Sequence, residues 1–230
     1  MVLTPPRRWP LLVALASGFG VALGVVTIAL SLVSVRAPVA PARPVAAVGG
    51  APATQGANQH SIGSPNAPVV VTEWSDFQCP ACRIYALGRD PLLEQQYAGT
   101  GQVRFVYRNY AFLGFESILA AEAAETAADQ GKYWEYRNLL WQRQRGENLG
   151  TFKLENLKGF AAELGLDQAK FNAAMDGGLH RAEVLAETQE GQKLGVNATP
   201  TLFVNGRKMV GVPTVEAMKA AIEEELAKKR

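Results

Sequence analysis

Cysteine and histidine are scarce in this sequence. Its 230 residues include 2 cysteines and 2 histidines, which are too few for a disulfide-stapled scaffold or for a four-ligand Cys/His zinc site. An excess of charge is also lacking, because 23 basic residues face 21 acidic ones and the formal net charge is +2. The basic residues are scattered along the chain, which argues against a nucleic-acid partner. We therefore expect no metal site built on cysteine and no binding of nucleic acid.

Length and composition predict one well-buried domain with extensions. The chain is 48% hydrophobic and 19% charged. A chain of this length is too short for two domains of ordinary size. No internal repeat is evident, so a solenoid or propeller is not expected.

The first distinct segment is Trp9–Val35, a run of about 27 residues without a charge. A helix of this length exceeds the roughly 30 Å of hydrocarbon in a bilayer. We therefore expect residues 1–36 to form a cytoplasmic tail and a single retained transmembrane helix. The alternative is a signal peptide cleaved near Ala40–Ala42, which the length of the run disfavours.

Residues 37–67 have the composition of a linker. Prolines recur among alanines, glycines and small polar residues, with few large apolar side chains to bury. This composition predicts a flexible tether between the membrane and the following domain. His60 lies in this segment, and we expect it to be solvated.

Residues 68–230 show an α/β order of elements. Val69–Trp74 and Val103–Tyr107 are short β-branched or aromatic runs typical of strands, and a helix is expected between them from about Cys79. Proline suits the first turn of a helix, which supports this start, and Asp90-Pro91 should interrupt the helix. A strand-helix-strand unit of this kind is typical of a parallel sheet.

A block of helices and a final hairpin complete the pattern. The helices are expected over residues 117–130, 133–144, 151–164, 167–176 and 179–195, and several of them end at glycine. Asn205-Gly206 favours a tight turn between strands Thr201–Val204 and Arg207–Val210. The last helix, from about Thr214, has an apolar face at spacings of three and four residues. We expect the aromatic side chains of Tyr133, Trp134, Tyr136 and Trp141 to lie in the core, the alternative being that some of them border a substrate groove. His180 is expected to be a surface or capping residue where a helix begins.

The segment Cys79-Pro80-Ala81-Cys82 follows the carboxyl end of the first strand. Reactive groups gather at this edge of α/β sheets, where helix N-termini carry a partial positive charge. That field would stabilise a thiolate at Cys79 and make it the attacking sulfur, with Cys82 one turn further along the helix to close a disulfide. The alternatives are two inert buried thiols or half of a metal site.

Two motifs resemble those of a known family. Residues 74–83, Trp-Ser-Asp-Phe-Gln-Cys-Pro-Ala-Cys-Arg, resemble the active-site segment of the DsbA-type thiol-disulfide oxidoreductases with a thioredoxin fold, and are most similar to the membrane-anchored BdbD-like branch. Residues 195–206 resemble the cis-proline loop, strand and hairpin of the same family. The resemblance extends from about residue 68 to the C-terminus and implies a thioredoxin fold with a helical insertion at about residues 115–195.

The resemblance also implies roles for individual residues. Glu73, six residues before Cys79, corresponds to a buried carboxylate that would take the proton of Cys82. The alternative is a Glu73 that is only salt-bridged or placed at a strand end. Thr199-Pro200 would form a cis bond beside the cysteines and expose backbone groups to a substrate chain, the alternative being a trans proline that starts a strand.

Pro80 and Ala81, between the cysteines, are also expected to contact the substrate. The strongly oxidising members of the family have histidine where this chain has Ala81, so the oxidising strength does not follow from the resemblance.

We expect a membrane-tethered oxidoreductase outside the cytoplasm that donates disulfides to exported or unfolded cysteine-containing proteins. Its redox-active group would be the Cys79–Cys82 disulfide, with no other cofactor. The resemblance implies reoxidation by a quinone-linked membrane protein of the DsbB or VKOR type, and a catalytic disulfide persists only in an oxidising compartment. The alternatives are an isomerase or reductase kept reduced by a membrane electron donor, and a non-catalytic redox-sensing or protein-binding module.

Overall fold

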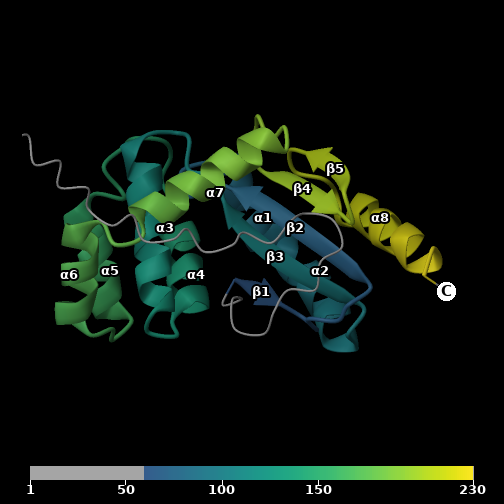
Figure 1. The fold of residues 1–230 in the computed structure, drawn as a ribbon, viewed down its shortest axis with the longest axis horizontal. Coiled ribbons are helices and arrows are strands. Elements are labelled where there is room, and N and C mark those ends of the chain that lie inside the picture. Colours follow the sequence, from purple (N-terminus) through teal and green to yellow (C-terminus); the bar gives the residue numbers. More distant parts are fainter. Residues whose placement is uncertain (1–59, 230) are drawn as a thin grey trace, which may run out of the picture. The chain divides into compact units, whose positions relative to one another are not determined.

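The computed structural model describes residues 60–229, which contain a five-stranded sheet with strand order β1-β3-β2-β4-β5 (Figure 1). The strands are β1 (Ser61–Ile62), β2 (Val69–Ser75), β3 (Val103–Asn109), β4 (Thr201–Val204) and β5 (Arg207–Val210). β2 and β3 are parallel, whereas β4 is antiparallel to β2 and β5 is antiparallel to β4. This α/β sheet has the topology expected of a thioredoxin fold.

Two helices connect the parallel strands. α1 (Pro80–Gly88) and α2 (Asp90–Tyr97) are followed by the short 3-10 helix η1 (Ala98–Thr100). The interruption expected near Asp90-Pro91 is confirmed, because α1 ends before Arg89 and Pro91 lies in the first turn of α2. A parallel pair requires such a crossover connection, and this one places the N-terminus of α1 at the carboxyl end of β2.

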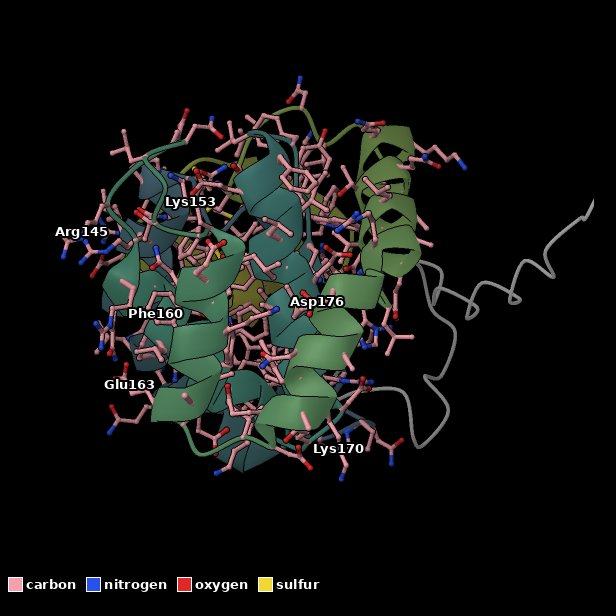
Figure 2. The ribbon with its side chains drawn as sticks, turned by 90° about the vertical axis from the view of Figure 1, so that its left-hand side faces the viewer. Arg145, Lys153, Phe160, Glu163, Lys170 and Asp176 are labelled. Carbon is pink, nitrogen blue, oxygen red and sulfur yellow. The ribbon has the colours of Figure 1, made fainter. Side chains whose placement is uncertain are left out.

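A helical insertion separates β3 from β4, as expected. It consists of α3 (Phe115–Ala128), α4 (Tyr133–Arg143), α5 (Leu154–Glu163), α6 (Gln168–Gly177) and α7 (Arg181–Lys193). Figure 1 shows α3 to α6 gathered at one end of the sheet, with α7 leading back toward it and α8 (Val215–Ala227) at the other end. Figure 2 shows exposed charged side chains, such as those of Glu163 and Lys170, on the outer surfaces of α5 and α6.

The buried apolar side chains form two main clusters. One lies between the sheet and α1, α2 and α8, and includes Val71, Phe105 and Met218. The other lies mainly in the insertion and also contains both cysteines. The aromatic residues Tyr133, Tyr136 and Trp141 belong to it, which confirms that these three lie in the core, whereas Trp134 is only partly buried and packs against both clusters.

His60 is part of the folded domain, and the expectation of a solvated linker residue is wrong. Its Nε2 atom lies 3.0 Å from Glu125 Oε2, and its ring stacks on Tyr133 with 4.1 Å between the ring centroids. Its carbonyl oxygen accepts a hydrogen bond from the Tyr107 N–H, and the next two residues pair with β3 as β1. Residues 60–62, at the end of the expected linker, therefore belong to the sheet.

His180 precedes α7 as expected, but it is buried rather than on the surface. Its two ring nitrogens lie 3.3 Å from Glu183 Oε2 and 2.7 Å from Asp129 Oδ2. The pKa of His180 is raised to about 9, mainly by its contact with Glu183 and also by Asp129, against the opposing effect of burial. His180 is therefore the N-cap residue of α7, as expected, but its ring bridges two acidic side chains and makes no capping hydrogen bond.

The expected membrane helix lies outside the described residues, as does most of the linker. Within residues 60–229, none of the helices combines the length and the apolar character needed to cross a bilayer.

Gly191 is a close contact point between α7 and the sheet. A Cβ atom at this position would lie 2.7 Å from Tyr110 and 2.9 Å from Trp74, whereas Gly159 in α5 has no such neighbour within 4 Å. We predict that Gly191→Ala lowers the free energy of unfolding by about 1–3 kcal/mol because the buried contact becomes overpacked. Gly159→Ala should raise it by about 0.5–1 kcal/mol through helix propensity. Urea denaturation of both variants tests this prediction. Equal changes in the free energy of unfolding would contradict a tight contact at Gly191.

Candidate active site

The two cysteines occupy different positions on α1. Cys79 is the N-cap residue with extended backbone angles, and Pro80 begins the helix. Cys82 lies one turn along the helix and is fully buried, whereas Cys79 retains 7% of its exposure. Both are free thiols in this structure. Both sulfurs are therefore largely shielded from solvent, and Cys79 is the more accessible of the two.

The surroundings of Cys79 favour its thiolate form. The pKa of Cys79 is lowered to about 6, first by a hydrogen bond with Cys82 and further by Thr199 and by the backbone N–H groups of Ala81 and Cys82, while burial opposes the shift. These N–H groups lie in the first turn of α1, where a helix has no internal acceptors for them. The N-terminus of α1 therefore contributes the partial positive charge that the sequence predicts beside Cys79.

Cys82 behaves in the opposite way. Burial, the hydrogen bond with Cys79 and the charges of Cys79 and Glu73 hold the pKa of Cys82 well above its ordinary value. At neutral pH the pair is therefore one thiolate and one thiol. The two thiols therefore differ in pKa in the direction expected of an attacking and a resolving cysteine.

The Thr199-Pro200 loop lies against Cys79. The peptide bond is cis, as the resemblance implies, and the Cys79 thiol donates a hydrogen bond to the Thr199 carbonyl oxygen at 3.3 Å. Pro200 is buried and Thr199 is partly exposed. Two segments that are 120 residues apart in the sequence therefore meet at one sulfur.

Glu73 lies on β2 and is 2% exposed. Its Oε1 atom accepts a hydrogen bond from the Ser75 hydroxyl, whereas Oε2 has no hydrogen-bond partner and lies 3.5 Å from Arg137 Nη2. The pKa of Glu73 is raised, mainly by burial, with the charge of Arg137 acting in the opposite direction. Glu73 is thus salt-bridged to Arg137, as the alternative interpretation holds, and its Oε2 atom accepts no hydrogen bond.

The turn before Cys79 is held by polar residues for which the sequence pattern predicted no role. Asp76, which is buried, accepts hydrogen bonds from the Gln78 N–H at 2.8 Å and the Ser117 hydroxyl at 2.6 Å. Its other oxygen accepts from two N–H groups of the loop that leads into α3, those of Phe112 and Leu113. The sequence offered one signal for this role, because Asp76 lies between a buried strand and a largely apolar helix. A polar side chain in such a place needs buried hydrogen-bond partners.

Gln144 and Asn148 hold the same turn from the insertion. The Gln144 side-chain amide donates to the carbonyl oxygens of Phe77 at 2.7 Å and Cys79 at 2.9 Å. The Asn148 N–H donates to Gln78 Oε1 at 2.6 Å. The helical insertion is therefore bonded directly to the segment that carries the attacking sulfur.

The described residues offer no group of three His, Cys, Asp or Glu side chains arranged as ligands of one metal ion. The chemistry that the site supports directly is thiol-disulfide exchange between two unequal sulfurs.

The difference between the sulfurs predicts how reduced protein is alkylated. With iodoacetamide, the rate of Cys79 labelling should reach half its maximum near pH 6, because the thiolate is the nucleophile and the pKa of Cys79 is about 6. Cys82 should stay unlabelled until the protein is unfolded. Peptide mass spectrometry across a pH series measures both rates. Faster labelling of Cys82, or a Cys79 midpoint near the ordinary value of about 8.5, would refute this assignment.

Comparisons with known proteins agree with this geometry. A thioredoxin family model matches residues 55–224. The probable disulfide bond formation protein D of Bacillus anthracis is 31% identical over 174 residues, which cover 74% of this chain and 79% of that protein. The crystal structure of oxidised BdbD from Bacillus subtilis matches with a TM-score of 0.68 and 25% identity, over 74% of this chain and 94% of that one.

A further match is limited to part of a larger protein. The Na(+)/H(+) antiporter NhaA 1 of Salinispora arenicola is 35% identical over 166 residues, which are 71% of this chain but 24% of the antiporter. Transport activity is therefore not carried over to this chain. The family model, the relatives named for disulfide bond formation and the BdbD structure together show that the chain belongs to the thioredoxin family and is a thiol-disulfide oxidoreductase.

Proposed function

We propose that this enzyme donates its Cys79–Cys82 disulfide to exported cysteine-containing proteins. The observation that carries the proposal is the position of Cys79 at the N-cap of α1, where its surroundings lower its pKa and favour the thiolate. A thiolate with a low pKa is a good leaving group, and stabilising the reduced form makes the disulfide a stronger oxidant. The names of relatives, disulfide bond formation protein D, support the same direction of electron flow.

The reaction proceeds through a mixed disulfide. A substrate thiolate attacks Cys79 of the oxidised pair, which forms a substrate–Cys79 disulfide and releases Cys82 as a thiolate. Glu73 then supplies a proton to Cys82. A second substrate thiolate attacks the substrate sulfur of the mixed disulfide, which leaves the substrate oxidised and Cys79 as a thiolate. The enzyme gains two electrons in each cycle.

The residues around the sulfurs take part in binding the substrate in this proposal. Thr199 offers backbone groups beside Cys79 for pairing with an extended substrate segment, and Pro80, Ala81 and Pro200 border the reacting sulfur. This arrangement is supported by the hydrogen bond between the Cys79 thiol and the Thr199 carbonyl.

The cellular setting is part of the same proposal. The charge-free run Trp9–Val35 anchors the chain in the membrane, with Arg7 and Arg8 on the cytoplasmic side and the catalytic domain outside. A quinone-linked membrane protein of the DsbB or VKOR type removes the two electrons from the reduced pair. Support comes from the hydrophobic run and from the need of a catalytic disulfide for an oxidising compartment.

Trapping experiments with two single variants test this function. Cys82→Ala removes the intramolecular route by which Cys79 is released, so this variant should accumulate mixed disulfides with exported proteins. Cys79→Ala should trap almost nothing, because the remaining sulfur is fully buried. Non-reducing gels of acid-quenched cells, with and without dithiothreitol, measure the adducts. Equal trapping by the two variants would overturn the assignment of the attacking sulfur.

A further inference from the structure

Glu73 belongs to a buried cluster of charged groups that extends away from the cysteines. Arg137 Nη2, on α4, lies 3.5 Å from Glu73 Oε2 and 3.1 Å from Asp90 Oδ2. All three side chains are nearly inaccessible to solvent. One guanidinium nitrogen is thus shared by two buried carboxylates from different elements, β2 and α2.

The cluster continues through Tyr107 to the edge of the fold. The Tyr107 hydroxyl contacts Asp90 Oδ2 at 2.6 Å and also Glu94 Oε1, and Glu94 is partly exposed. The Arg137 guanidinium lies over the Tyr107 ring, 3.9 Å from its centroid. A hydroxyl carries one hydrogen, so both contacts are full hydrogen bonds only when one of the two carboxyl groups is protonated.

The charge balance of the cluster leads to the same conclusion. Glu73 and Asp90 carry two negative charges when both are ionised, and Arg137 compensates one of them. Uncompensated charge is costly in a buried site, so the cluster is most stable when it also holds protons. Burial and the charge of Glu73 raise the pKa of Asp90 well above its ordinary value, although Arg137 opposes this.

We propose that Arg137 and Asp90 are positioning residues that set the proton affinity of Glu73 during the Cys82 step. Arg137 favours the ionised form of Glu73, which can then accept the proton of Cys82. Asp90 shares Arg137 and adds a negative charge, which favours the protonated form of Glu73. The inference rests on the proposed function, in which Glu73 is the acid and base for Cys82.

The shared contact explains how Glu73 can change its charge inside the core. The charge of Glu73 is one cause of the raised pKa of Asp90, so protonation of Glu73 favours the ionised form of Asp90, which then faces Arg137. Neither protonation state of Glu73 therefore leaves the guanidinium buried without a counter-ion, which would be strongly destabilising. A single carboxylate facing Arg137 would be held ionised by the pair and would be a poor proton donor.

The proton balance of the reoxidation step follows directly. Cys82 passes its proton to the Glu73 carboxylate and becomes a thiolate. The thiolate attacks Cys79 in a mixed disulfide with the oxidant, which forms the Cys79–Cys82 bond and releases the partner thiolate. The proton on Glu73 is then lost to solvent at the side of the cluster where Glu94 is partly exposed.

Glu73 is faced by titratable or charged groups from each neighbouring helix and from β3, which all influence its charge. These are Cys79, Cys82 and Tyr85 of α1, Asp90 and Glu94 of α2, Tyr107 of β3, and Tyr133 and Arg137 of α4. On the β4 side its register partner is the apolar Leu202. Arg137 is the one cation among these groups, so its removal and the removal of Asp90 should act in opposite directions.

The test uses the reduced full-length protein and the aromatic disulfide DTNB. Attack by Cys79 releases a first coloured thiolate in a step that depends on DTNB concentration. Attack by Cys82 on the resulting mixed disulfide releases a second thiolate in a step that does not. Stopped-flow absorbance gives the rate of the second step as a function of pH, and its midpoint reports the protonation of the base that serves Cys82.

Two substitutions should move this midpoint in opposite directions. Asp90→Asn removes a neighbouring negative charge, and Glu73 no longer shares Arg137 with a second carboxylate. The midpoint should therefore fall by about one pH unit. Arg137→Met removes the cation, so the midpoint should rise by a similar amount, and Arg137→Lys should restore it in part. If Arg137→Met does not fold, Asp90→Asn and Arg137→Lys still show whether the midpoint shifts in the expected direction.

Matched controls separate these effects from general ones. Arg207→Met removes an exposed arginine on β5 that pairs with Glu224, and Asp176→Asn removes an exposed aspartate on α6 that pairs with Lys158 (Figure 2). Both should leave the midpoint unchanged. Shifts of Asp90→Asn and Arg137→Met in the same direction, or no shift in either, would overturn the inference.

Glu73→Gln distinguishes this failure from a failure of the proposed function. Loss of the pH dependence of the second step in Glu73→Gln, without shifts in the Arg137 and Asp90 variants, would keep Glu73 as the base and reject the positioning role. An unchanged profile in Glu73→Gln would instead reject the role of Glu73 itself.

Discussion

The carboxylate of Asp76 fixes the turn on which the whole site depends. It accepts hydrogen bonds from Gln78, Ser117 and the loop after β3, so it joins the end of β2, the beginning of α1 and the beginning of α3. A buried acceptor with this many donors holds one geometry, because each lost partner would leave an unsatisfied group in the core. The position of Cys79 at the start of α1 follows from this turn.

That position gives two chemically similar thiols opposite properties. Cys79 lies where a hydrogen bond with Cys82, the Thr199 side chain and backbone N–H groups favour negative charge. Cys82 is enclosed by apolar side chains and faces the charges of Cys79 and Glu73. One turn of helix is therefore enough to separate a thiolate from a thiol. The insertion supports the arrangement through Gln144, which bonds the carbonyl of Cys79 itself. The insertion is thus structurally part of the site.

The features that the sequence predicts correctly have local causes. The order of strands and helices from β2 onward, the start of α1 near Cys79 and the Asn205-Gly206 turn follow from periodicity, proline and glycine within short segments. The cis Thr199-Pro200 bond beside Cys79 was expected only through the family resemblance. By contrast, the pairing of Arg137 with Glu73 joins α4 to β2 across a long stretch of chain, and no local pattern reports it. The docking of His60 onto Glu125 and Tyr133 was missed for the same reason.

The central claim is that the stabilised thiolate of Cys79 makes the Cys79–Cys82 disulfide an oxidant. The reduction potential of the pair, measured by equilibration of the full-length protein with glutathione buffers, tests this most directly. We expect a value well above the roughly −270 mV of thioredoxin, because a stabilised reduced form raises the potential. A value at or below that of thioredoxin would contradict the claim and would favour reduction or isomerisation of disulfides instead.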